Sequence, residues 1–120
     1  MDNEEITHKI IGAAYEVSNE LGAGFLEKVY ERALTVELNK RNIVFEKQKA
    51  LKIYYKDILV GDYIADFIVE NKIIIELKAV SELDNNHLAQ VLNYLKAANM
   101  HTGLLINFGT PKVQIKRVVH

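Results

Sequence analysis

The sequence predicts an α/β domain of the α+β type, in which helices flank a central mixed sheet and the elements follow the order ααβββαββ. Three observations lead to this prediction. Two helical patterns open the chain, a stretch rich in β-branched and aromatic residues follows, and a third helical pattern precedes two short apolar runs. With 120 residues, of which 49% are hydrophobic, residues 1–120 are expected to form one domain.

The first two elements are predicted to be amphipathic helices. Within residues 6–21 the apolar positions recur at steps of three and four, at Ile6, Ile10, Ala13, Ala14, Val17 and Leu21. Gly22-Ala23-Gly24 then interrupts the pattern with residues that tolerate left-handed torsions. A second helical pattern runs over about residues 25–41, so two helices come first.

Strands replace helices after residue 42, where β-branched and aromatic residues occur in alternating or short apolar runs. Lys56-Asp57 and Glu70-Asn71-Lys72 are polar breaks of hairpin length. They predict three strands near residues 44–55, 58–69 and 72–80 that follow one another as an antiparallel meander. The spacing leaves the register of the first strand open.

A third helix is predicted over about residues 84–99, with Ser81 or Asp84 as its N-cap. Its buried stripe is expected to contain Leu88, Val91, Leu92, Leu95 and Ala98. Strands at residues 102–108 and 113–119, separated by the turn Gly109-Thr110-Pro111, complete the predicted fold.

The net charge, the composition and the absence of certain motifs argue against several classes of protein. The formal net charge of −1 gives no global cationic field, so a nucleic-acid partner would need a local basic face. No cysteine, secretory leader or membrane-length apolar stretch occurs, and a cytoplasmic protein without a membrane partner is expected. The absence of a P-loop, a GxGxxG fingerprint and a GxSxG elbow argues against three large enzyme classes.

Three charged residues interrupt the apolar strands. Glu76 and Lys78 lie two apart in the third strand, so both side chains share one face of the sheet, and Asp66 stands alone in the apolar run of the second. A buried unpaired charge costs several kcal/mol, so these groups require partners, a metal or a wet cleft. For Glu76 and Lys78 alone, a salt bridge on a solvated sheet surface is an equally good interpretation. Asp66 favours a functional site.

A metal site would explain this set of charges. The carboxylates of Asp66 and Glu76, with the backbone carbonyl of Leu77, offer the hard oxygen ligands that Mg2+ or Mn2+ prefers. Lys78 would orient or deprotonate the attacking water and offset charge in the transition state. The pattern Asp…Glu-x-Lys is loose, but its specificity rises when it falls on adjacent apolar strands followed by a helix.

Asp66…Glu76-Leu77-Lys78 resembles the catalytic signature of the PD-(D/E)xK nuclease superfamily, and the predicted element order is similar to that superfamily's αβββαβ core. Gly24-Phe25-Leu26-Glu27-Lys28-Val29-Tyr30 matches the motif that names the narrower GxxExxY family. The resemblance implies a restriction-endonuclease-like fold and metal-dependent hydrolysis of phosphodiester bonds, with DNA or RNA as the partner.

The resemblance also assigns roles outside the strands. It implies that Glu27 is a third catalytic carboxylate and an additional metal ligand; otherwise Glu27 is a solvated residue that complements the helix dipole. Gln90 and Tyr94, four apart on one helix face, resemble the QxxxY element of RecB-like nucleases. These two residues and Tyr30 are expected either to support the site or to contact nucleic acid, whereas an ordinary structural role would half-bury Tyr94 against the sheet.

Two other functions stay open at this point. A non-catalytic nucleic-acid-binding module could keep the fold and the charges, and a homo-oligomer could pair an exposed sheet edge with a second copy. Lysines beside Tyr54 and Tyr55 could bind phosphate or simply protect a strand edge, namely Lys47, Lys49, Lys52 and Lys56.

Overall fold

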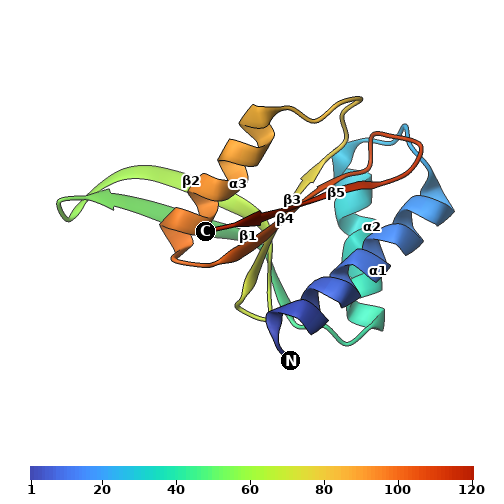
Figure 1. The fold of residues 1–120 in the computed structure, drawn as a ribbon, viewed down its shortest axis with the longest axis horizontal. Coiled ribbons are helices and arrows are strands. Elements are labelled where there is room, and N and C mark those ends of the chain that lie inside the picture. The colour runs from blue at the N-terminus through green and yellow to red at the C-terminus, as the bar shows by residue number, and fades with distance from the viewer.

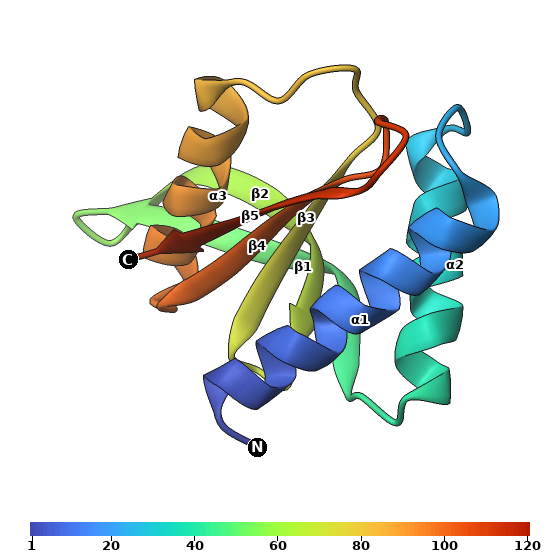
Figure 2. The ribbon, with the colours of Figure 1, turned by 45° about the vertical axis from the view of Figure 1, so that its right-hand side comes forward.

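Five strands form one mixed sheet, and three helices cover its two faces (Figures 1 and 2). The computed structural model describes residues 1–120. The elements are α1 (Asn3–Leu21), α2 (Glu27–Lys40), β1 (Phe45–Tyr55), β2 (Ile58–Val69), β3 (Ile73–Lys78), α3 (Asn85–Ala98), β4 (Thr102–Asn107) and β5 (Gln114–Val119). This order confirms the predicted ααβββαββ arrangement.

The strands lie in the sheet in their sequence order, from β1 to β5. β1, β2 and β3 form the predicted antiparallel meander, with two polar turns in which Lys56, Asp57, Glu70 and Asn71 have positive φ. β3 and β4 pair in parallel because α3 carries the chain back across the sheet between them. β5 returns antiparallel to β4, so the sheet is mixed, as predicted.

Capping residues set the helix boundaries. α1 begins three residues before the predicted start, because Asp2 accepts a hydrogen bond from the backbone N–H of Glu5. Asp84, and not Ser81, caps α3: its carboxylate accepts from the N–H groups of Asn86 and His87, and the His87 ring accepts from the N–H of Asp84. Asn99 ends α3 in the left-handed conformation, with φ 54°.

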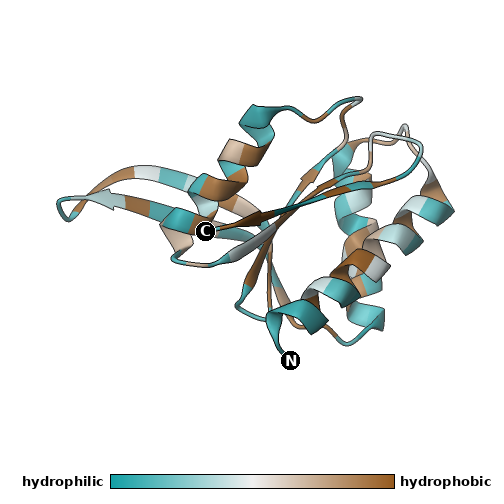
Figure 3. Ribbon diagram, viewed as in Figure 1, coloured by the Kyte–Doolittle hydropathy of each residue, from teal (hydrophilic) through white to brown (hydrophobic).

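The sheet separates two apolar clusters. α1 and α2 pack on one face with the larger cluster, which includes Ile75 and Leu77 of β3, whereas α3 packs on the other face with Ile74 (Figure 2). In Figure 3 the central strands are largely hydrophobic and the helices carry both hydrophobic and hydrophilic turns, while further hydrophobic segments lie along the β1–β2 hairpin. None of the three helices combines the length and hydropathy that a membrane span requires.

The β1–β2 hairpin extends past the other elements as an arm, here called the β1–β2 arm and comprising residues 51–64 (Figure 1). Its tip lies far from α1 and α2, and a register shift interrupts its pairing between Ile53 and Tyr54. Several of its large apolar side chains are exposed, namely Tyr54, Tyr55, Ile58, Leu59, Val60, Tyr63 and Ile64. The base of the arm runs beneath α3.

Candidate functional site

Asp66 and Glu76 meet where the ladder between β2 and β3 stops. The backbone pairing between the two strands ends at Phe67 opposite Ile75. Beyond that pair, side chains replace the ladder: Glu76 Oε1 accepts from the Asp66 N–H at 2.9 Å, and Asp66 Oδ2 accepts from the Leu77 N–H at 2.8 Å. The hairpin therefore brings together the two carboxylates that the sequence singles out.

Burial gives these carboxyl groups unusual protonation behaviour. Glu76 is only 4% exposed, and its burial, reinforced by the charge of Asp66, raises its pKa to about 8. Burial also raises the pKa of Asp66, although hydrogen bonds from the Leu77 N–H and Gln48 oppose that shift. The pKa of Glu27 rises too, first through burial and then through the charge of Asp66. Burial therefore disfavours the ionised form of all three carboxyl groups.

Lys78 supplies positive charge to the same place. Its ammonium group lowers the pKa of Glu27, Asp66 and Glu76, but in each case the raising effect of burial is larger. The four predicted charged residues therefore share one electrostatic environment at the junction of α2, β2 and β3. Lys78 is half-buried, so its head group remains accessible to water.

A buried asparagine fixes the chain that follows Lys78. Asn107 Oδ1 accepts from the Val80 N–H at 3.0 Å, and Asn107 Nδ2 donates to the Val80 carbonyl at 2.9 Å. The Phe108 N–H donates to the Lys78 carbonyl at 2.9 Å. These bonds tie the end of β3 to β4 and hold the backbone of Lys78 in place.

Sequence reasoning missed two residues of the site, Glu31 and Gln48. A hollow of about 320 Å3 is lined by Glu27, Lys28, Glu31, Gln48 and Asp66. Glu31 is 6% exposed and accepts hydrogen bonds from Gln48 Nε2 at 2.5 Å and from Lys28 Nζ at 3.1 Å. Gln48 Nε2 also lies 3.3 Å from Asp66 Oδ1, so it bridges a carboxylate of α2 and one of β2.

The backbone of Gln48 is strained. Its φ of 51° lies in the left-handed region, which non-glycine residues seldom adopt and which is rarer still within a strand. Strain of this kind persists only when surrounding contacts enforce it. The sequence marks Gln48 only as an uncharged residue between Lys47 and Lys49, and this pattern does not predict its backbone conformation.

Tyr30 lies in the core and not on the site surface. The side chain is fully buried, stacks on Phe108 with ring centroids 4.8 Å apart, donates its hydroxyl hydrogen to the Gly22 carbonyl at 2.6 Å and accepts from the Phe25 N–H at 3.2 Å. Contact with a substrate would require exposure. Of the two roles that the sequence left open, support of the turn before α2 fits these contacts.

Gln90 and Tyr94 share one face of α3, as predicted. Gln90 Nε2 donates to the Tyr94 hydroxyl at 3.0 Å, and the Tyr94 ring lies 5.3 Å from that of Tyr63 between centroids. Tyr94 is 5% exposed. It is therefore more deeply buried than an ordinary structural role, which predicts a half-buried side chain, would require. Burial, followed by the charge of Glu76, raises the pKa of Tyr94. The Tyr94 ring belongs to the apolar cluster of Ala65 and Ile74, on the sheet face that α3 covers.

The donor set fits a hard divalent cation. Asp66 and Glu76 place two carboxylates next to each other across the β2–β3 hairpin, and carboxylate oxygens are the hard ligands that such a cation prefers. Mg2+ needs only one or two protein carboxylates, since it retains several waters and takes further oxygens from phosphate. No three His, Cys, Asp or Glu side chains gather closely enough to chelate a metal on their own, so Glu27 does not complete a protein cage.

Comparisons with known proteins agree with this fold. Residues 4–118 match the sequence model of the PD-(D/E)XK nuclease superfamily. The crystal structure of SSO0001 superposes with a TM-score of 0.60 at 22% identity and covers 98% of this chain. The chain spans 59% of the length of SSO0001, so it matches part of that protein.

An alkaline exonuclease from Laribacter hongkongensis, LHK-Exo, also shares the fold. Its crystal structure superposes with a TM-score of 0.52 at 8% identity, covering 99% of this chain and 82% of the exonuclease. At such low identity the likeness concerns the fold alone. No protein of curated function matches the sequence.

Proposed function

Because the chain belongs to the PD-(D/E)XK nuclease superfamily, we propose that it is a divalent-metal-dependent nuclease that hydrolyses phosphodiester bonds in DNA or RNA. The observation that carries the proposal is the meeting of Asp66 and Glu76 at the end of the β2–β3 ladder, within the field of Lys78. Nucleases of this superfamily generally use divalent metals. Here Asp66, Glu76 and the carbonyl of Leu77 would hold Mg2+ or Mn2+.

The proposed chemistry divides between the cation and the chain. A bound divalent ion would polarise a phosphate oxygen and lower the pKa of a water molecule. The ammonium group of Lys78 would orient that water and stabilise the charge that develops on the phosphate. Glu27, whose pKa is raised by burial, would accept or return a proton at the edge of the site. Gln48 would hold the Asp66 carboxylate in position.

The narrower relationship to the GxxExxY family is part of this proposal. Gly24 has φ 111°, a conformation that disfavours any side chain, and the next motif position, Glu27, is the first residue of α2. Tyr30, the third, locks the turn through its bonds to Gly22 and Phe25. Each motif residue therefore has a physical task in presenting Glu27 to the site.

Cleavage assays test the proposal directly. Wild type, Glu76→Gln and Lys78→Met would be incubated with single- and double-stranded DNA and RNA, with Mg2+, Mn2+ or EDTA. The matched control is Glu20→Gln, an exposed glutamate near the end of α1. We expect cleavage by wild type and Glu20→Gln in the presence of metal, and a loss of at least about 100-fold in the two site variants. Equal cleavage by wild type and Glu76→Gln would point to a contaminant and refute the assignment.

The same assay identifies the alternatives. Saturable nucleic-acid binding without cleavage, unaffected by Asp66→Ala or Lys78→Ala, would indicate a non-catalytic binding module. A chain that neither cleaves nor binds, and whose mass in light scattering is a multiple of 13.7 kDa, would indicate a homo-oligomeric assembly function.

A further inference from the structure

A groove runs between α3 and the β1–β2 arm and adjoins the candidate site. It consists of two neighbouring cavities, of about 410 Å3 and about 320 Å3, which share Tyr63 and Asn93. Together they are here called the α3 groove. Each volume lies within the range of ligand pockets, and the smaller cavity also contacts Gln90 and Tyr94.

Three uncharged amide side chains run along the α3 wall of the groove. Asn86, Gln90 and Asn93 recur at steps of four and three, followed by Ala97 four residues later, so they form one stripe along the helix. The stripe carries no charge, although a solvent-facing helix stripe usually does. Amides in such a row can donate to and accept from a polar ligand that is itself neutral.

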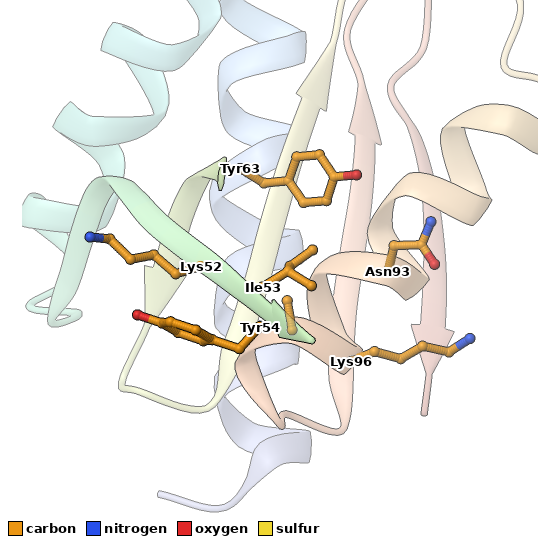
Figure 4. A pocket seen from close by; sticks show the side chains of 7 residues that line it. Lys52, Ile53, Tyr54, Tyr63, Asn93 and Lys96 are labelled. Carbon is orange, nitrogen blue, oxygen red and sulfur yellow. The ribbon is translucent and has the colours of Figure 1, made fainter. Parts of the chain in front are cut away.

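The arm forms the opposite wall with an aromatic and an aliphatic side chain. In Figure 4, Tyr63 and Ile53 extend from the arm to the side on which α3 lies. The side chains of Lys52 and Tyr54 extend away from the helix, and Lys96 projects on the far side of the groove (Figure 4). The interior is therefore neutral and partly aromatic, and Lys96 places a positive charge at its rim.

The groove and the candidate site lie next to each other on the sheet, because Tyr94 packs in one apolar cluster with Ala65, the neighbour of Asp66, and with Ile74, two residues before Glu76. Tyr94 lines the groove, packs against Tyr63 at 5.3 Å between ring centroids, and accepts the Gln90 hydrogen bond. Ile74 and Glu76 lie two apart in β3, so the Glu76 side chain lies on the same sheet face as Ile74, the face that Tyr94 covers. A polymer with one unit at Asp66 and Glu76 would lay its adjacent units in the groove.

We propose that the α3 groove binds the unpaired bases of a single-stranded nucleic acid, DNA or RNA, whose backbone continues into the candidate site. Base edges would pair with the amide side chains, and a base would stack on the exposed ring of Tyr63. The rim lysine Lys96 suits the phosphates, which stay outside a neutral interior. A duplex would bury these base faces within its own stack and leave the amide stripe without partners. This inference rests on the proposed function, because it names the substrate class of that site.

Binding measured without catalysis tests the inference. Fluorescein-labelled single-stranded and duplex oligonucleotides, as DNA and as RNA, would be titrated with protein in EDTA and followed by anisotropy. The variants are Tyr63→Ala, Asn93→Ala and Tyr63→Trp, with circular dichroism to verify folding. The matched control is Tyr15→Ala on α1, because Tyr15 is 39% exposed and Tyr63 is 41% exposed.

We expect single strands to bind more tightly than duplexes, and Tyr63→Ala to weaken single-strand binding by about ten-fold, as the loss of one stacked base predicts. Asn93→Ala, which does not disturb the core, should weaken single-strand binding in the same direction. Tyr63→Trp should restore it, and Tyr15→Ala should match wild type. The DNA and RNA arms show which sugar the groove prefers.

Tighter binding of duplex than of single strand, or equal binding by Tyr63→Ala and Tyr15→Ala, would overturn the groove assignment. So would the absence of any nucleic-acid binding. The groove and the hydrolytic function can fail separately. Groove-dependent binding with no cleavage in Mg2+ refutes hydrolysis alone, whereas cleavage that is unchanged in Tyr63→Ala and Asn93→Ala refutes the groove alone.

Discussion

Gln48 holds Asp66 from the edge strand: its Nε2 lies 3.3 Å from Asp66 Oδ1, and the backbone of Gln48 has φ 51° to make this reach. The same amide bridges to the buried carboxylate of Glu31. The strained backbone of Gln48 is expected to lower the stability of the fold, while its side chain fixes the position of the Asp66 carboxylate.

Comparing Gln48→Ala with Gln48→Gly separates the strain from the side chain's contacts. Both changes remove the bonds to Asp66 and Glu31, so cleavage should fall by a similar factor, about ten-fold, in the two variants. Only glycine relieves the positive φ, so Gln48→Gly should be more stable than Gln48→Ala by about 1 kcal/mol. Urea unfolding measures the difference, and equal stability would show that the strain is absent.

Glu76 predicts an unusual dependence of stability on pH in metal-free protein. Its pKa is about 8 in the fold against an ordinary value of 4.5, so the folded chain retains a proton that the unfolded chain releases. Stability should therefore fall as pH rises from about 5 through 8, because unfolding becomes coupled to proton release. Thermal unfolding in EDTA between pH 5 and 9 would measure this decline.

Glu76→Gln is the control for that experiment, since an amide of the same shape cannot titrate. Its stability should change much less with pH, and above pH 8 the variant should be more stable than metal-free wild type. Added Mg2+ should stabilise wild type more at pH 8 than at pH 6, because metal and proton compete for the same carboxylate. A wild-type profile that matches that of Glu76→Gln would mean that Glu76 is ionised in the fold at neutral pH.

Tyr30→Phe tests whether Tyr30 supports the turn or binds substrate. Removing the hydroxyl deletes the hydrogen bonds to Gly22 and Phe25 and leaves the part-buried Gly22 carbonyl with one partner fewer. The free energy of unfolding should therefore fall by about 1–2 kcal/mol. Cleavage per folded molecule and KM should change little. Tyr15→Phe, on the exposed side of α1, is the control. A large rise in KM for Tyr30→Phe would favour the substrate role instead.

Gly109 lies where β4 meets the chain after Lys78. A Cβ there would approach the Val80 backbone within 2.2 Å of its carbonyl oxygen, so Gly109→Ala must displace that segment. We expect a loss of about 3 kcal/mol in stability and reduced cleavage, because Lys78 would move with it. Gly61→Ala is the control, since its Cβ would meet only the Ile53 side chain at 3.5 Å. Equal stability of the two variants would contradict the close approach.

The order of elements followed from local signals in the sequence. Periodicity identified the helices, the Lys56-Asp57 turn identified the hairpin, and Asp84 was a recognisable N-cap. The apolar context of Asp66 and Glu76 also sufficed to bring them together, because a meander with a turn at Asn71 places them opposite each other. These features depend on neighbours along the chain or across one hairpin.

The missed features depend on contacts that spacing does not encode. The register of β1 was left open, and that register decides that Gln48 lies beside Asp66. Glu31 stood on a helix face where a solvated glutamate is ordinary, yet Gln48 and Lys28 satisfy it in a buried position. Likewise the stacking of Tyr30 on Phe108 joins segments far apart in sequence, so its burial was not predictable.

The break in the β2–β3 ladder has a spectroscopic consequence. The amide hydrogens of Asp66 and Leu77 are held by carboxylates and not by backbone carbonyls, so their chemical shifts depend on what the carboxylates carry. A proton, a cation or a displaced side chain would each shift these two resonances, while amides of the intact pairs would report only on the strand. Asp66 and Leu77 are thus built-in probes of the occupancy of the site, readable in the unmodified protein.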